Sequence, residues 1–167
     1  MTNSLSFEME KDLLIKGWMS HDARWFSAVR EHFGIDAANR LNQTVCRELG
    51  RVEMKRYMKT LALSPAKDLK KYLTLKEAAL SLYGSGLAEY EIKTLNDQSY
   101  EMHMKRCFAY ENIVKAGLKD QYECGIFARL QGWIDAQGLG HELTPTLGKC
   151  MKVLGGECCY TVRLQFP

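Results

Sequence analysis

Four cysteines in the second half of the chain have the side-chain chemistry and spacing of a metal site: Cys107, Cys124, Cys150 and Cys158. Cys124 is expected to open a helix, while the other three lie at the ends of predicted strands, so the thiols can converge on one point. Tetrahedral zinc needs Zn–S distances of about 2.3 Å. Because a tight turn at Gly155-Gly156 would put Cys150 and Cys158 on opposite faces, such a site requires residues 151–157 to form a wider loop.

The residues alone leave two readings of this group open. Cys107 is the natural fourth ligand, and His141, Glu142 and Cys159 are alternatives to it. Zinc is then the predicted cofactor, held as a structural ion. Without metal, the same cysteines are buried, reduced thiols that pack as small apolar side chains.

The C-terminal third resembles the 4-vinyl-reductase-like domains, which include the aromatic-sensing domains of phenol-responsive transcription activators. The resemblance is carried by Cys124, Gly132-Trp133, Cys150, Gly155, Cys158 and Tyr160. In those sensors three cysteines and a glutamate bind structural zinc, and here Leu147 stands at the position of the glutamate. The resemblance implies a small apolar or aromatic ligand and a homodimer.

A second resemblance is to small proteins related to the L-2-amino-thiazoline-4-carboxylic acid hydrolase family. It rests on the segments 20–26, Phe33-Gly34, 105–107 and Gly117-Leu118. It implies hydrolysis of a small heterocyclic amidine, with Cys107 or Cys124 as nucleophile, His21 or His103 as base, and Asp22 orienting the base. If this resemblance is set aside, His21 and Asp22 are solvated residues at the start of a helix. Whether the protein is an enzyme stays open.

Aromatic and methionine side chains gather around the predicted sheet and could line an apolar pocket. The residues predicted to bind the ligand are Tyr100, His103, Phe127 and Trp133. Ordinary core packing is the alternative for the aromatic residues, and a solvent-facing position is the alternative for His103. The first function predicted is therefore small-molecule binding, the second is hydrolysis, and a third is an accessory protein that handles metal or sulfur through its thiols.

Composition narrows the class of protein. A net charge of +3 on 167 residues does not require a nucleic-acid partner, and the basic stretch from Arg47 to Lys71 reads as a solvated helix face. No apolar run approaches the roughly 18 residues of a membrane span, so no membrane partner is expected. The first 16 residues do not form a signal peptide. We therefore expect a cytoplasmic protein with reduced cysteines.

Hydrophobic periodicity predicts an α+β fold with a four-stranded antiparallel sheet packed against helices. After a leader (1–19), helices are expected near 20–34, 36–63, 66–83, 108–117 and 124–137, with a turn at Gly84–Gly86. Strands are expected near 87–95, 99–107, 141–149 and 158–166. An N-terminal helical segment (1–83) and an α+β part (84–167) would together form one compact domain.

Overall fold

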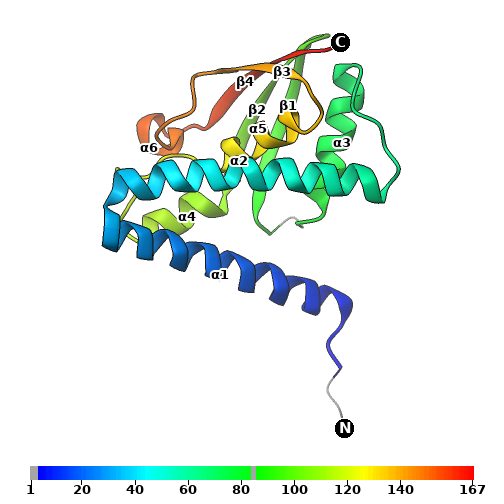
Figure 1. Ribbon diagram of the computed structural model, residues 1–167. Helices are drawn as coiled ribbons and strands as arrows, with labels where there is room; N and C mark the ends of the chain where they lie inside the picture. The colour runs from blue at the N-terminus through cyan, green and yellow to red at the C-terminus, as the bar shows by residue number, and fades with distance from the viewer. Residues whose placement is uncertain (1–3, 84–85) are drawn as a thin grey trace. The chain divides into compact units, whose positions relative to one another are not determined.

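The computed structural model describes residues 4–83 and 86–167 (Figure 1). The predicted turn at Gly84–Gly86 falls mostly on residues outside this range. The chain divides into two compact units, Met1–Arg40 and Leu41–Pro167. The predicted fold class is confirmed, because an N-terminal helical segment precedes a four-stranded antiparallel sheet with helices.

The first unit is dominated by one long helix, α1 (Phe7–Phe33). The side chain of Ser6 caps its start by accepting a hydrogen bond from the Met9 N–H at 3.3 Å. The prediction that this helix begins at Ser20 is wrong. The Ser20 hydroxyl donates to the Lys16 carbonyl at 2.7 Å, one turn back inside the helix, and so does not act as a cap. Gly34, at φ 83°, ends α1.

Helix α2 (Ile35–Thr60) begins in the first unit and continues into the second. The remaining helices are α3 (Leu69–Ser81), α4 (Phe108–Lys115), α5 (Ile126–Asp135) and α6 (Met151–Gly155). The strands are β1 (Ala88–Asn96), β2 (Ser99–Cys107), β3 (Gly140–Thr144) and β4 (Cys159–Gln165). The strand order in the sheet is β1-β2-β4-β3, and each neighbouring pair is antiparallel.

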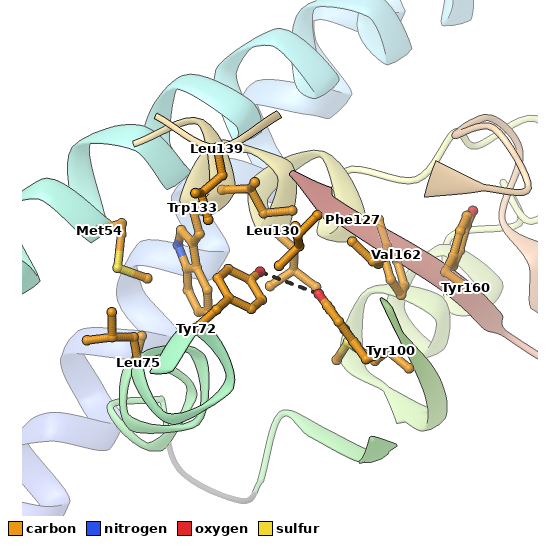
Figure 2. Close-up of a cluster of buried hydrophobic side chains, with 14 of the residues drawn as sticks. Met54, Tyr72, Leu75, Tyr100, Phe127, Leu130, Trp133, Leu139, Tyr160 and Val162 are labelled. Atoms are coloured by element: carbon orange, nitrogen blue, oxygen red, sulfur yellow. Dashed lines mark hydrogen bonds between the residues drawn. The ribbon is translucent and has the colours of Figure 1, made fainter. Parts of the chain in front are cut away.

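One face of the sheet forms the core of the second unit. Alternate residues of β2 and β4 are buried, and they oppose one another in register, as Tyr100 opposes Val162 and Met102 opposes Tyr160. Helices α2, α3 and α5 supply the other side chains of this core, including Met54, Tyr72 and Trp133 (Figure 2). The period-two pattern in the sequence therefore identified the buried face correctly.

The loop before β4 differs from the prediction. Strand β3 ends at Thr144, not near residue 149, since Pro145 has no N–H to continue the ladder. Residues 151–155 form α6, and Gly156 ends it in a left-handed conformation at φ 76°. Gly155-Gly156 is thus not a hairpin turn, and Cys150 and Cys158 flank the wider loop that the metal hypothesis required.

Helices α2 and α5 approach each other through glycines. A Cβ on Gly132 would lie 2.1 Å from the Arg47 carbonyl oxygen, and a Cβ on Gly50 would lie 2.1 Å from the Arg129 carbonyl oxygen. Both obstructing atoms are backbone, so neither can rotate away. The close contact of the two helices therefore requires glycine at both positions.

Gly132→Ala should lower the free energy of unfolding by about 3 kcal/mol, because the added methyl forces α5 away from α2. Urea denaturation followed by circular dichroism measures this change. Gly155→Ala is the matched control, since no atom lies within 4 Å of a Cβ built at that helical glycine. Equal stability of the two variants would contradict the predicted backbone clash.

Candidate functional site

The predicted thiol group lies entirely in the second unit, where backbone contacts fix three of the segments that carry it. A β-bridge between Glu123 and Lys149 holds two of its members in place. The Cys124 N–H donates to the Gly148 carbonyl at 2.8 Å, and the Cys150 N–H donates to the Tyr122 carbonyl at 3.3 Å. The Cys158 carbonyl accepts from Met104 on β2 at 2.8 Å. These contacts bring segments far apart in the sequence to one end of the sheet.

Burial governs the protonation of these thiols. Burial raises the pKa of Cys124 to about 12, and neighbouring thiols, including Cys107, raise it further, although the Phe127 N–H at the start of α5 opposes the shift. Burial also raises the pKa of Cys158 to about 12, and it raises the pKa of Cys107. At Cys124 burial outweighs the single N–H bond at the start of α5. These thiols are neutral near pH 7.

No group of three or more His, Cys, Asp or Glu side chains within residues 4–83 and 86–167 is arranged to hold a metal ion. The prediction that Cys107, Cys124, Cys150 and Cys158 form a zinc-binding cluster is therefore wrong. None of the six cysteines forms a disulfide. The structure favours the alternative interpretation, in which these thiols pack as small apolar side chains.

The residues predicted to be catalytic fall in different units of the chain. His21 and Asp22 are exposed on α1 in the first unit, with 3.7 Å between the His21 Nδ1 and an Asp22 carboxylate oxygen. Cys107, in the second unit, caps the start of α4 without a side-chain hydrogen bond. His103 lies on the sheet face opposite the core, where its Nδ1 is 3.0 Å from the Lys105 Nζ.

An apolar cavity lies between the sheet and helices α3 and α5. It is lined by Leu80, Tyr83, Leu87, Ala88, Tyr90, Met102, Met104, Phe108, Ile126, Arg129, Leu130 and Trp133. Of the predicted ligand-binding residues only Trp133 lines it, while Tyr100 and Phe127 are fully packed core residues. The cavity encloses about 80 Å³, well below the roughly 300–1,000 Å³ of drug-sized ligand pockets.

A buried carboxylate beside this cavity was not anticipated from the sequence. Glu53 of α2 accepts hydrogen bonds from the Arg129 guanidinium, with Nε at 2.7 Å, from the Tyr83 hydroxyl at 2.6 Å and from the Trp133 indole at 3.1 Å. The side chains of Glu53 and Arg129 are 19% and 14% exposed, so the pair is largely removed from water. Burial raises the pKa of Tyr83 to about 12. The cluster ties α2 to α5 and to the turn that follows α3.

A second buried charge lies on α3. Lys76 has no exposed surface, and its amine is 3.1 Å from both the Tyr100 hydroxyl and the Met102 sulfur. The amine also lies 4.3 Å from the centre of the Tyr100 ring. The Tyr100 hydroxyl in turn is 3.4 Å from the Tyr72 hydroxyl (Figure 2). Burial lowers the pKa of Lys76 to about 7, and nearby Glu77 opposes this shift.

Both units expose apolar side chains on their long helices. In the first unit none of the 27 residues of α1 is buried, and Phe7, Leu14 and Trp25 are 76%, 75% and 61% exposed. In the second unit Leu41, Val45 and Val52 are exposed on one side of α2. Rows of exposed apolar side chains of this kind are typical of surfaces that bind other proteins.

The fold is that of a solved protein that belongs to an assembly. This chain is similar to a trafficking protein particle complex subunit 3 from Naegleria fowleri. The crystal structure of that protein shows it covalently bound to palmitic acid. The TM-score is 0.56, with 95% of this chain and 96% of the other covered, at 15% sequence identity. At this level of identity the likeness establishes the shared fold.

The chain belongs to a family of unknown function, DUF6125, whose sequence model matches residues 5–131. No curated protein matches the sequence. Both resemblances drawn from short motifs, to the 4-vinyl-reductase-like domains and to the thiazoline hydrolases, are therefore corrected. The residues that carried the first have packing roles, because Gly132 permits the contact with α2 and Trp133 donates to Glu53.

The functions inferred from those resemblances are corrected with them. The fold likeness is to a subunit of a trafficking complex, and not to a ligand-sensing domain or a hydrolase. The small cavity and the neutral thiols agree with this correction. Within the described residues, no helix combines the length and the apolar character needed to cross a membrane.

Proposed function

We propose that this protein is a subunit of a multiprotein assembly with a role in trafficking, and that it forms a dimer within that assembly. The observation that carries the proposal is the fold likeness to a trafficking complex subunit over nearly the whole of both chains. A protein of this kind acts through its surface, so its function depends on which faces bind other chains.

The surface and the thiols of this chain support the proposal. Leu41, Val45 and Val52 form an exposed apolar row along α2 that suits a helix or strand of another protein. The row is flanked by charged side chains such as Glu48 and Lys55, which can form the polar rim of an interface. None of the six cysteines forms a disulfide, which fits a reducing compartment, so we place the assembly on the cytoplasmic side.

The test is isolation of the tagged protein from its native cells, followed by co-expression with each stoichiometric partner and native mass spectrometry. We expect a complex of fixed composition that contains this chain. The double variant Val45→Asp/Val52→Asp should abolish it, whereas Lys67→Glu, at an exposed position outside α2, should leave it intact. A chain that binds no partner, or a complex that withstands the double variant and every other change to the exposed apolar rows, would overturn the proposal.

A further inference from the structure

The two edges of the sheet in the second unit differ in their capacity to pair with a further strand. Strands β1 and β3 lie at the ends of the strand order, so each has backbone groups on one side that no neighbouring strand pairs. Strand β3 has five residues and is followed at once by Pro145, which cannot donate to a ladder. Strand β1 has nine residues and contains no proline. The edge open to a further strand is therefore β1.

The regular part of β1 is short and symmetric about Ile92. The pairing with β2 shifts just after Glu89 and again just before Asn96, so the uninterrupted run is Tyr90–Thr94. Irregularities of this kind bend a strand and limit what can pair with it. Within the described residues, the backbone of this run bonds to no segment other than β2. A further strand of about five residues can therefore be added along this run.

We propose that the added strand is β1 of a second copy of the chain, paired antiparallel with Ile92 at the symmetry axis. The inference rests on the proposed function and names the contact through which its dimer forms. In this register Glu91 lies directly opposite Lys93 of the other copy, and symmetry repeats the pair. On the face toward the core, Ile92 lies opposite Ile92, and Tyr90 lies opposite Thr94. Aliphatic pairs and pairs of an aromatic with a β-branched side chain both stabilise neighbouring strands.

The charges on the outer face of the sheet select this register. Charged side chains on an edge usually prevent pairing, but those of β1 alternate in sign and so complement a second copy. Other registers that keep both cores on one side are shifted in steps of two residues. The nearest two place Glu91 opposite Glu91 or Lys93 opposite Lys93. In the proposed register these like charges lie only on the diagonals, roughly 7–8 Å apart, whereas the opposite charges are about 5 Å apart.

The neighbouring strand β2 continues this alternation of charge. Glu101 lies opposite Lys93, and the Lys105 Nζ is 3.2 Å from a Glu91 carboxylate oxygen. Across the joined edges the order is Glu101 and Lys93 of one copy, then Glu91 and Lys105 of the other. The Glu91 side chain is 72% exposed, so a second cation can reach it. Each charge in this row therefore has neighbours of the opposite sign.

The charges beyond the regular run leave this balance unchanged. Glu89 lies opposite Leu95 of the other copy, which carries no charge. Its diagonal neighbours there are Lys93 and Asp97, one of each sign, at the longer spacing of roughly 7–8 Å. The net attraction therefore comes from Glu91 and Lys93.

The test is the oligomeric state of the full chain, measured by sedimentation velocity over a range of concentrations. The wild-type protein should be a dimer. Glu91→Lys and Lys93→Glu should each raise the dimer dissociation constant about tenfold, because each turns two attractive pairs into repulsive ones. The double variant Glu91→Lys/Lys93→Glu restores the pairs and should return the constant close to the wild-type value. Glu142→Lys, at an exposed position on the other edge strand β3, is the matched control and should leave it unchanged.

Hydrogen exchange reports the backbone of the same contact. The amides of Tyr90–Thr94 should exchange more slowly at high protein concentration than at low, because the second strand supplies acceptors for them. The amides of β3 should exchange at the same rate at both concentrations. Protection that appears on β3 instead of β1 would place the dimer on the other edge and overturn the inference.

The outcomes separate this inference from the proposed function. A monomeric wild-type chain overturns the inference, and so does a dimer that withstands both single charge variants. If the multiprotein complex still forms in either case, the proposed function stands. If the chain pairs through β1 but joins no complex in its native cells, the proposed function alone fails.

Discussion

Replacing Lys76 with methionine should raise the free energy of unfolding at pH 6–7 by about 3–5 kcal/mol. The lysine amine is fully buried, and its polar contacts are one phenol hydroxyl and one thioether sulfur. Neither neutral group compensates for the hydration that a charged amine loses on burial. Methionine keeps the unbranched apolar stem and removes the charge, while Tyr100 retains its contact with Tyr72.

The pH dependence follows from the direction of the shift. The pKa of Lys76 falls from 10.5 to about 7 on folding. Between these values the unfolded chain binds a proton that the folded chain does not, so stability rises with pH across this window. The slope reaches about 1.4 kcal/mol per pH unit. The stability gained by Lys76→Met should therefore shrink as the pH rises from 7 and nearly vanish above about 10.

Urea denaturation of wild type and variant at several pH values between 6 and 10 measures both effects. Lys70→Met is the matched control, since Lys70 lies on the exposed side of the same helix and should leave the slope unchanged. An identical pH slope in wild type and Lys76→Met, or a less stable variant, would show that the amine is not buried as a neutral group.

The sequence predicted the sheet better than the helices, because a half-buried strand shows a regular alternation of apolar and polar residues. Tyr100, Met102 and Met104 alternate with polar residues, and each of the three is buried. The start of α1 was missed because Ser20 has the chemistry of a cap, and only the backbone shows that it lies inside a continuous helix. The end of β3 was predicted too late, although Pro145 gave a local signal for it.

The candidate site was only partly predictable, because burial decides its chemistry. The sequence places the cysteines at the ends of elements, but their raised pKa values depend on how much protein surrounds each sulfur. The burial of three charged residues, Glu53, Lys76 and Arg129, could not be predicted. Most such side chains lie in water, and nothing in the neighbouring residues shows that these three do not.

Glu53→Met should lower the free energy of unfolding by about 3–5 kcal/mol, because it leaves the Arg129 guanidinium largely buried without its carboxylate. Arg129, Tyr83 and Trp133 all donate to this one side chain. Because these donors come from α5 and from the turn that follows α3, losing the acceptor weakens the attachment of both to α2. Urea denaturation measures the loss, and near-ultraviolet circular dichroism of Trp133 and Tyr83 reports the local packing.

A double variant separates the charge effect from simple loss of contacts. Arg129→Met, added to Glu53→Met, removes the unpaired charge and should recover much of the lost stability, since a buried ion pair replaced by apolar side chains is often nearly neutral. The recovery should be incomplete, because Tyr83 and Trp133 still lack an acceptor. Glu48→Met on the same helix is the control, and its exposed pairing with Arg51 should contribute less than about 1 kcal/mol. If the double variant is as unstable as the sum of the two single variants, the two charges are not coupled, and Glu53 stabilises the fold through its neutral hydrogen bonds instead.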